Sequence, residues 1–301
     1  MLHARMLSYL DEVARCGSIR KAAANLNVAS TAINRQIIAL EQELGEPLFE
    51  RMPRRLRLTA AGEVLIEHVR ETLKSYDRTR GRLDALKGTK QGHISIATTL
   101  GLAAGPIAKI IHEYTQEHPY VRFVLQGLFA GGIPNAVISG DVDLGLGFNL
   151  QRNAKLKTLF GLDVPFGAVV APSHPLAQRE KVRLSEAATY PLVLAEQRMS
   201  LRALVDLALA RVSVTPRPIV ETNSIELMKQ YVHLGQAVTF LNPLDVAEDR
   251  LVGRLRYLPI GETLTQSMTL IARHRGTIDP ATSRFVEHLK RSLTQLTETY
   301  A

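Results

Sequence analysis

The sequence predicts a multidomain α+β chain with a small helical N-terminal unit, a long linker helix and a C-terminal region of two α/β lobes. Its 301 residues are about twice the length of a typical single domain. Up to residue 87 the apolar residues recur mostly at spacings of three and four, which is typical of amphipathic helices. From residue 93 on, short apolar runs alternate with helical stretches in a βαβ pattern.

Two helices are predicted at the start of the chain. The first covers residues 2–14, and its single apolar face carries Leu2, Met6, Leu7, Leu10 and Val13. Gly17 ends this helix, and Ser18 is placed to cap a short second one. The second helix carries Ile19, Ala22, Ala23 and Leu26. Its alanines allow a neighbouring helix to approach closely, and a tight turn at residues 27–29 follows it.

A third helix is predicted over residues 30–44, with Gly45 as its C-terminal cap. Its apolar stripe consists of Ile33, Ile37, Leu40 and Leu44, and its opposite face carries Ser30, Thr31, Asn34 and Arg35. Arginine binds guanine through two hydrogen bonds, asparagine suits adenine, and hydroxyls bind bases or phosphate oxygens. These four polar residues are therefore candidates for reading DNA. The alternative is an ordinary solvated helix face.

A hairpin is predicted next, with short strands at residues 48–49 and 57–58 around a turn at residues 52–54, because Pro47 stops the third helix. The hairpin carries four closely spaced guanidinium groups, those of Arg51, Arg54, Arg55 and Arg57. Such density favours phosphate binding through counterion release. Behind a helix-turn-helix, the hairpin takes the position of a wing against the DNA backbone or minor groove.

A long helix is predicted from Thr59, its N-terminal cap, to about Lys87. Its apolar positions are Ile66, Val69, Leu73, Tyr76 and Leu83, with Arg80 interrupting them. At 1.5 Å per residue this helix spans roughly 40 Å, a length that favours an imperfect dimerising coiled coil. Residues 88–92 are predicted to form a hinge, so the expected domains are 1–58, 59–91 and 92–301.

The C-terminal region is predicted to form lobe I, over about 92–161 and 267–301, and lobe II, over about 162–266. Predicted strands are 94–97, 121–125, 143–147, 167–171, 192–195, 238–241 and 268–272. Predicted helices are 106–117, 201–211 and one from about residue 280. This alternation is typical of parallel or mixed sheets covered by helices.

Charge and composition exclude several classes of protein. The net charge is +8, and residues 1–90 hold 16 Lys and Arg against 11 Asp and Glu, so the basic excess is concentrated there. Charged residues within the first 30 break any signal peptide or membrane span, and the single Cys16 forms no internal disulfide, so we expect a cytoplasmic protein. Residues 145–147 lack the third glycine of a dinucleotide motif, and the scattered histidines show no metal-ligand spacing. We expect no enzyme activity, cofactor or metal.

Many residues at fixed spacing between positions 7 and 65 carry a family resemblance. They are Gly17, Ser18, Ala22, Ala23, Ala32, Ile33, Arg35, Gln36, Ile37, Leu40, Glu41, Leu44, Gly45, Leu48, Phe49, Glu50, Arg51, Leu58, Thr59, Ala61, Gly62 and Glu63. Through them the chain resembles the LysR family of transcriptional regulators, and residues 174–177, 223–224 and 235–238 extend the match. The chain departs from the family at residues 29–31, where Ala-Ser-Thr replaces Ser-Gln-Pro, and at Asn34, where serine is usual. Arg35 keeps the family residue.

The resemblance implies a winged helix-turn-helix, a dimerising linker helix and a two-lobed, periplasmic-binding-protein-like effector domain. Strand ends and helix starts are where such lobes bind anions. By similarity to the family the effector cleft is lined by Thr98, Thr99, Gly127, Leu128, Phe148, Asn149, Ser200, Arg202, Asn223 and Ser224. The hydroxyls also fit plain helix caps, and Arg202 fits either a carboxylate clamp or a surface arginine.

The sequence therefore predicts a sequence-specific, DNA-binding transcriptional regulator controlled by a small-molecule effector, with a small organic anion favoured. The expected partners are double-stranded promoter DNA, the effector and further copies of the chain, as a homodimer or homotetramer, with no membrane. The alternative is a solute-binding or enzymatic α/β protein without a DNA role. That alternative requires a secretion signal or a catalytic constellation, and binding insensitive to salt would favour it.

Overall fold

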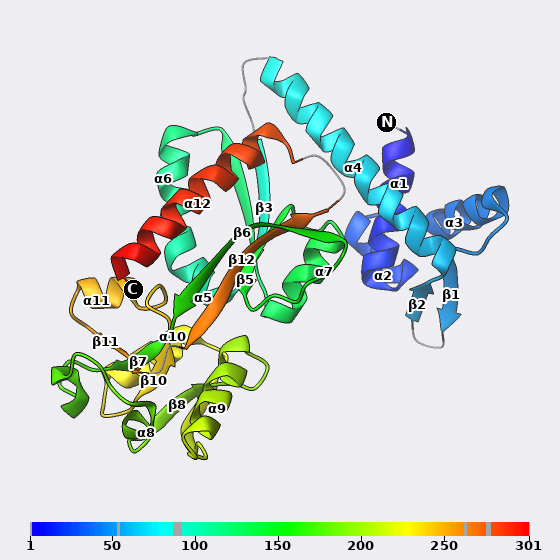
Figure 1. Ribbon diagram of the computed structural model, residues 1–301. Coiled ribbons are helices and arrows are strands. Elements are labelled where there is room, and N and C mark those ends of the chain that lie inside the picture. Colours follow the sequence, from blue (N-terminus) through cyan, green and yellow to red (C-terminus); the bar gives the residue numbers. More distant parts are fainter. Residues whose placement is uncertain (1, 53–54, 87–91, 262–263, 275–277, 301) are drawn as a thin grey trace. The chain divides into compact units, whose positions relative to one another are not determined.

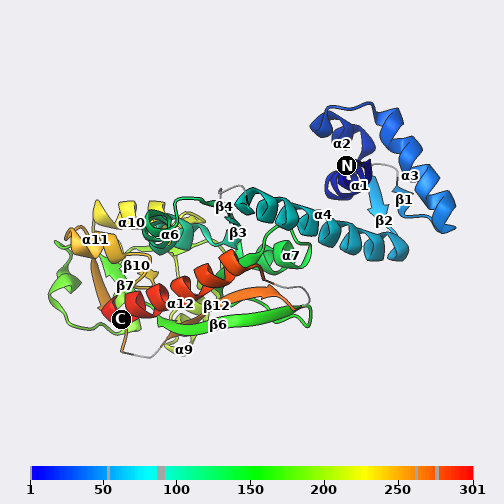
Figure 2. The same ribbon diagram turned by 90° about the horizontal axis from the view of Figure 1, so that it is seen from above.

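The computed structural model describes residues 2–52, 55–86, 92–261, 264–274 and 278–300. The chain forms two compact units, residues 1–90 and residues 91–301 (Figures 1 and 2).

The N-terminal unit packs four helices and a hairpin around one core. Its elements are α1 (Leu2–Cys16), α2 (Ile19–Leu26), α3 (Ser30–Leu44), β1 (Phe49–Met52), β2 (Arg55–Leu58) and α4 (Ala60–Leu86). The buried residues of this core come from α1, α2, α3 and α4, together with Leu48 just before β1. Leu10, Ala22, Ile33 and Val69 are each at most 2% exposed, so every helix contributes to one apolar cluster.

The ends of these helices follow from local chemistry, as the sequence predicted. The backbone N–H of Lys21 donates to Ser18 Oγ at 3.4 Å at the start of α2. Gly45 adopts a left-handed conformation with φ of 71° after α3, and Gly62 N–H donates to Thr59 Oγ1 at 3.0 Å at the start of α4. The third predicted helix, 30–44, is confirmed at both ends.

Two details of the prediction for this unit are wrong. Met52 belongs to β1 rather than to the turn, because the strands pair from Phe49 with Leu58 up to Met52 with Arg55. Leu44 is 47% exposed, because the apolar cluster along α3 ends at Leu40.

Only part of the apolar stripe of α4 is left exposed, because its first residues pack within the unit. Ile66 and Val69 are buried in the unit's own core, and Leu73 packs against it, whereas Tyr76 is 41% exposed. Arg70 Nε donates to Asp11 Oδ1 at 2.6 Å and ties α4 to α1. The first part of the predicted dimerisation stripe therefore packs within the same chain. The predicted hinge lies outside the described residues except for Gly92, as do the side chains of Arg80 and Leu83.

Lobe I of the C-terminal unit is built on a five-stranded sheet in the order β4-β3-β5-β12-β6. Its strands are β3 (Gly92–Thr98), β4 (Val121–Gly127), β5 (Leu144–Phe148), β6 (Leu156–Pro165) and β12 (Thr265–Arg273). Its helices are α5 (Leu100–Ala104), α6 (Pro106–Glu117), α7 (Ile133–Ile138) and α12 (Pro280–Tyr300), with a 3-10 turn at Ala130–Gly132. One apolar cluster joins α6 and α12 to the sheet, and a separate cluster joins α7 to it, so helices cover both faces.

Lobe II combines a three-stranded sheet, β10-β7-β11, with a parallel pair, β8-β9. Its strands are β7 (Gly167–Val170), β8 (Leu192–Ala195), β9 (Pro218–Thr222), β10 (Thr239–Leu241) and β11 (Arg256–Pro259). Its helices are α8 (Leu184–Ala187), α9 (Ser200–Arg211), α10 (Ile225–His233) and α11 (Ala247–Leu251), with a 3-10 turn at Pro175–Gln178. A bridge between Leu192 and Val238 joins the two sheets over one core.

The chain passes between the lobes twice, through neighbouring segments. Phe166 separates β6 of lobe I from β7 of lobe II, and the return passage ends at Leu264 before β12. Phe166 N–H donates to the Leu264 carbonyl oxygen at 3.0 Å, and Thr265 pairs with Pro165. The two passages therefore lie side by side (Figure 1).

The strands and helices predicted for this unit are all present, with shifts of a few residues at their ends. The strands β6, β9 and β11 were not predicted.

Candidate DNA interface and effector site

The start of α3 presents the polar face that the sequence predicted. Thr31 and Arg35 are exposed, Ser30 and Asn34 are half-buried, and Ile33 lies fully buried behind them. These four polar side chains therefore lie opposite the core.

No side chain caps α3 at its N-terminus. Ala29 occupies the cap position, and its carbonyl oxygen accepts the N–H of Ala32 at 3.0 Å. Unlike Ser18 before α2, Ala29 has no side-chain oxygen to accept a further N–H group of the first turn. A phosphate or base edge in front of α3 therefore meets both free donors and the positive end of the helix dipole.

The hairpin presents arginines on its outer face. Arg55 and Arg57 are exposed, whereas Leu56 and Leu58 pack against the core, as the twofold alternation of a strand requires. In the register of the two strands Arg57 stands opposite Glu50, and Arg51 stands opposite Leu56. The side chain of Arg51 and all of Arg54 lie outside the described residues.

Backbone hydrogen bonds hold this hairpin to the helices. Leu56 N–H donates to the Gly17 carbonyl oxygen at 2.8 Å, at the turn between α1 and α2. Thr59 N–H donates to the Leu48 carbonyl oxygen at 3.1 Å. A methyl group on Gly62 would come 2.1 Å from the same Leu48 oxygen, so only glycine lets α4 start this close to the hairpin.

In lobe I the predicted effector residues lie at strand ends. Thr98 ends β3 and is fully buried, and its Oγ1 has no hydrogen-bond partner among the described residues. Leu128 N–H donates to the Thr98 carbonyl oxygen at 2.9 Å, which places the end of β4, with Gly127, beside it. Thr99 occupies the N-cap position of α5 without a side-chain capping bond.

Phe148 and Asn149 end β5 next to β12. Phe148 is 6% exposed. Asn149 has a positive φ of 51°, and its Oδ1 accepts the Ser267 N–H at 3.1 Å. The Asn149 side chain thus stabilises the end of this strand pair, which reduces its freedom to contact a ligand.

In lobe II the predicted arginine is buried and paired within the chain. Arg202 is only 6% exposed, so its interpretation as a surface arginine is wrong. Its Nε donates to Asp206 Oδ1 at 2.8 Å, and its Nη1 donates to Glu221 Oε1 and to the Ala195 carbonyl oxygen, both at 2.9 Å. The carboxylates that it clamps belong to this chain, and they tie α9 to β8 and β9.

The serines of lobe II lie at helix starts. Ser200 is the first residue of α9, and Ser224 Oγ accepts the Leu227 N–H at 3.2 Å at the start of α10. Asn223 beside it is exposed.

The lobes meet where these predicted residues lie. A β-carbon on Gly101, in α5, would come 3.2 Å from Ile225 Cγ1, so the helix start after Thr99 lies beside the helix start after Ser224. The Arg198 guanidinium of lobe II lies 4.8 Å from the centroid of the Phe129 ring of lobe I. Predicted residues of both lobes therefore border one contact region.

Comparison with known proteins decides the family. Residues 4–63 match the bacterial regulatory helix-turn-helix model of the lysR family, and residues 87–294 match the LysR substrate binding domain model. The chain belongs to the LysR family. This LysR-type transcriptional regulator thus joins a helix-turn-helix to an effector-binding domain, and the alternative of an α/β protein with incidental N-terminal helices is set aside.

Characterised relatives agree with this assignment. The transcriptional dual regulator GltC of Bacillus subtilis is 30% identical to this LysR-type regulator over 247 residues, covering 81% of this chain and 82% of GltC. The structure of full-length CbnR in complex with its target DNA is 23% identical, covers 96% of this chain and 99% of CbnR, and has a TM-score of 0.62. A full-length OxyR variant from Pseudomonas aeruginosa is 18% identical, covers 98% of this chain and 96% of OxyR, and has a TM-score of 0.72. Both structures support the fold.

Sequence reasoning missed several residues of the lobe contact in this LysR-type regulator, namely Phe129, Arg198 and Asp245. Asp245 is buried, and Asn242 Nδ2 donates to its Oδ2 at 2.6 Å. Burial raises the pKa of Asp245 to about 7, against the opposing charge of Lys229. The sequence did contain a signal for Asp245, because an acidic residue stands there within a mostly apolar stretch, residues 237–246.

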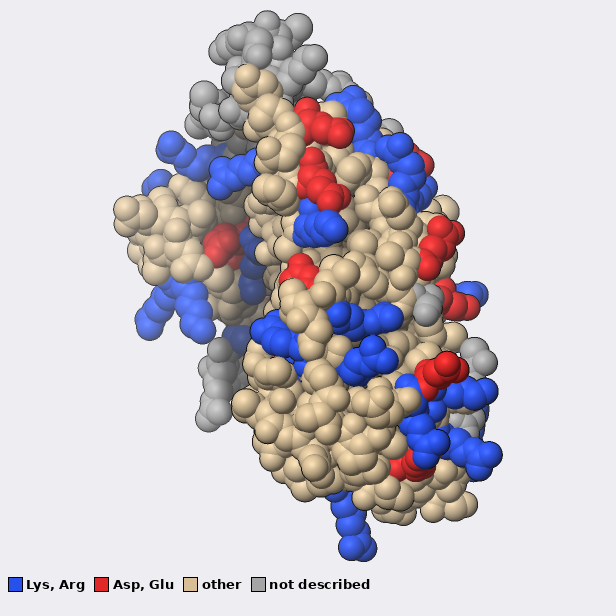
Figure 3. Space-filling view, turned by 90° about the vertical axis from the view of Figure 1, so that its left-hand side faces the viewer, with Lys and Arg blue, Asp and Glu red and all other residues tan. Residues whose placement is uncertain are grey.

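Two other kinds of feature are absent from the described residues. Among them no group of three or more His, Cys, Asp or Glu gathers to hold a metal ion. No described helix is long and apolar enough to cross a membrane. On the face in Figure 3, Lys and Arg are scattered with Asp and Glu among them, so net charge by itself does not locate the DNA interface there.

Proposed function

We propose that α3 and the hairpin of this LysR-type regulator form its DNA-contacting surface. Ser30, Thr31, Asn34 and Arg35 would meet base edges and phosphates in the major groove, and Arg51, Arg54, Arg55 and Arg57 would contact the backbone beside it. The observation that carries this proposal is the exposure of Arg35 and Thr31 on the face of α3 opposite buried Ile33. The uncapped start of α3 supports it.

The proposed division of labour gives one role to each of three segments. Residues 1–58 bind DNA, residues 59–91 link and dimerise, and residues 92–301 bind the effector. The proposal includes no catalytic role and no cofactor. It places the protein in the cytoplasm, where the chain meets DNA.

The proposed effector is a small organic anion that binds between the lobes. The contributing residues would be Thr98, Thr99, Gly127, Leu128, Phe148, Asn149, Ser200, Asn223 and Ser224. The buried, unpartnered Thr98 Oγ1 and the adjoining helix starts of α5 and α10 support this site, because N–H groups at helix starts bind anions. Arg202 enters the proposal as the residue that holds α9 in place, through Asp206 and Glu221.

The proposed assembly is a homodimer that pairs further into a homotetramer. Apolar side chains stand exposed on the edge strand β4, at Val124 and Leu125, on α10, at Leu227 and Tyr231, and at Leu234 just after α10. Exposed apolar side chains such as these gain by burial at a protein interface, and a second copy of the chain is the proposed occupant.

Selection from a pool of genomic or random DNA by the purified protein, with and without a panel of small carboxylic acids, tests the whole proposal. We expect enrichment of a partly palindromic site, because two recognition helices of a dimer read successive major grooves. We also expect one acid to change the footprint. Absence of enrichment at low salt would contradict the proposed DNA surface, and a footprint indifferent to every acid would contradict the proposed effector class.

A further inference from the structure

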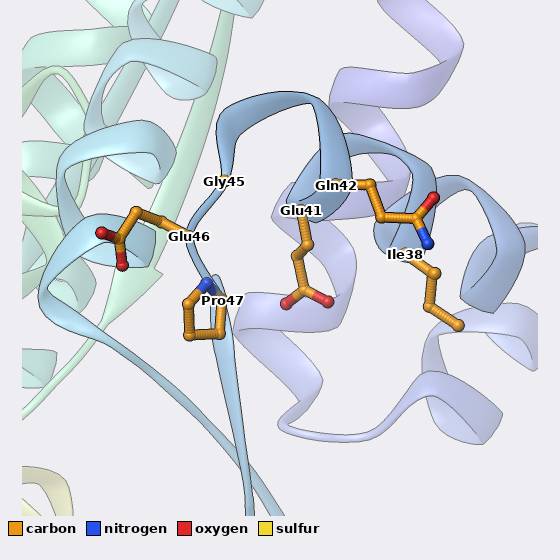
Figure 4. A pocket seen from close by; sticks show the side chains of 6 residues that line it. All are labelled: Ile38, Glu41, Gln42, Gly45, Glu46 and Pro47. Carbon is orange, nitrogen blue, oxygen red and sulfur yellow. The ribbon is translucent and has the colours of Figure 1, made fainter.

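A single carboxylate on α3, the helix proposed to read DNA, holds the start of the hairpin. Glu41 Oε1 accepts two backbone hydrogen bonds, from Leu48 N–H at 2.8 Å and from Phe49 N–H at 3.2 Å. Phe49 is the first residue of β1. In Figure 4 the Glu41 side chain extends from α3 into the space beside Pro47.

The other described hydrogen bonds that hold the hairpin do not involve α3. β2 is held by the Gly17 carbonyl oxygen, and the segment before β1 is held by Thr59, whose Oγ1 donates to the Pro47 carbonyl oxygen at 2.6 Å. Among the described hydrogen bonds, the pair at Glu41 alone joins α3 to the hairpin. Besides the apolar packing that α3 and the hairpin share, this side chain is therefore the directional link between them.

Glu41 contributes little to the apolar core. It is half-buried and lines a surface hollow of about 340 Å³ together with Ile38, Gln42, Gly45, Glu46 and Pro47. The core face of α3 is formed by Ile33 and Ile37 instead. Removing the carboxylate thus leaves a space that water already reaches, and alanine is the best helix former at such a position.

We infer that Glu41 is a positioning residue for DNA recognition, which fixes the hairpin so that Arg55 and Arg57 reach phosphates while α3 occupies the groove. Two hydrogen bonds to one charged oxygen are stronger and more directional than neutral ones. A binding site must hold its contacting groups to within about half an ångström, which such bonds accomplish. The inference rests on the proposed DNA contacts of the hairpin.

The test measures DNA affinity as a function of salt for the full-length protein on its selected site. The variants are Glu41→Ala, Glu41→Asp and Glu41→Gln, with Glu43→Ala as the matched control, because Glu43 is exposed on the same helix and makes none of the described bonds. We expect Glu41→Ala and Glu41→Asp to bind about fivefold to tenfold more weakly, with the slope of log affinity against log salt smaller by up to about 1.8, the value for two phosphate contacts. Glu41→Gln keeps an oxygen that accepts both bonds and should bind within about twofold of wild type.

A second arm separates this inference from the proposal beneath it. In an Arg55→Ala, Arg57→Ala background, Glu41→Ala should have a clearly smaller effect, since only the proposed contacts of Arg51 and Arg54 remain on the hairpin. Equal weakening in both backgrounds, or affinity equal to that of Glu43→Ala, would overturn the role of Glu41. If the double arginine variant itself retains wild-type affinity and salt slope, the proposed hairpin contacts are wrong, and the inference fails with them. Glu41→Asp keeps the charge and the helix, so it decides the question even if Glu41→Ala folds poorly.

Discussion

Gly101 lies directly against Asp245, so closely that a methyl group on Gly101 would come 2.7 Å from Asp245 Oδ1. Gly101 belongs to α5 in lobe I, and Asp245 follows β10 in lobe II. The two lobes thus touch at a position where only a glycine leaves room for a buried carboxyl group.

The first prediction concerns this contact. Gly101→Ala forces the backbone of α5 and the Asp245 side chain apart, and we expect it to lower the free energy of unfolding by about 1–3 kcal/mol, the usual cost of overpacking. Urea unfolding of the full chain measures the change. Gly235→Ala is the control, since a β-carbon there meets nothing within 4 Å, and it should change stability by less than about 0.5 kcal/mol. Equal stability of the two variants would show that the lobes yield freely at Gly101.

The second prediction concerns pH. Burial raises the pKa of Asp245 to about 7, so between about pH 4 and pH 7 the folded chain retains a proton that the unfolded chain has lost. Stability should therefore fall as pH rises through this window, by up to about 1.4 kcal/mol per pH unit. Asp245→Asn should flatten the dependence in urea unfolding between pH 5 and pH 8, whereas Asp163→Asn, at an exposed position of β6, should leave it intact. Parallel curves for wild type and Asp245→Asn would contradict this account.

The third prediction separates the structural role of Arg202 from ligand binding. Arg202→Ala removes the guanidinium that joins Asp206, Glu221 and the Ala195 carbonyl oxygen. We expect a loss of about 1–3 kcal/mol in the free energy of unfolding without any effector present, because the buried Ala195 carbonyl oxygen loses its donor. The two carboxylates are partly exposed, so water replaces part of what they lose. Arg217→Ala, at an exposed arginine, should be neutral in the same chemical unfolding experiment. A stable Arg202→Ala protein with impaired effector response would reverse the assignment.

The fourth prediction tests the recognition helix. Arg35→Ala should cost about 1–3 kcal/mol of specific DNA binding if the guanidinium reads a base. Electrophoretic mobility shift and footprinting on the selected site measure the loss. Gln42→Ala, exposed near the other end of α3, should bind normally. An unchanged footprint for Arg35→Ala would remove that residue from the base-reading set.

The fifth prediction uses two buried hydroxyls that lack partners among the described residues, at Thr98 in lobe I and Thr239 in lobe II. Valine has nearly the same shape, so Thr98→Val and Thr239→Val should each stabilise the chain by about 1 kcal/mol, as expected when an unsatisfied polar group is removed. Only Thr98→Val should weaken the effector response in a DNA-binding titration. Equal responses from both variants would exclude Thr98 from the effector site.

The sequence predicted much of the N-terminal unit because several of its helix boundaries are set by neighbouring residues. Ser18, Gly45 and Thr59 act within a few residues of their own position, so their effect is visible in the sequence. β6 was missed although Phe160, Leu162 and Val164 alternate along it, because its partner β12 lies far along the chain. Its intermediate burial also makes the apolar pattern weak.

Side chains whose surroundings come from distant segments could not be interpreted in the same way. Asp206 is one helical turn from Arg202 and was within reach of the sequence, but Glu221 and the Ala195 carbonyl oxygen come from β9 and β8. Burial of Asp245 depends on α5, which belongs to the other lobe. Tertiary packing therefore decides between an exposed, a buried and a ligand-binding role for the same residue type.

The paired passages at Phe166 and Leu264 have a mechanical consequence. Because the two segments are hydrogen-bonded to each other, we expect the lobes to move most easily by rotation about an axis through that pair, since sliding of one lobe along the other would break the bond between them. A molecule that contacts both lobes would bind at a distance from this axis. A small change at the cleft would then rotate one lobe relative to the other about this axis, and the displacement would grow with distance from the axis, toward the far ends of the lobes.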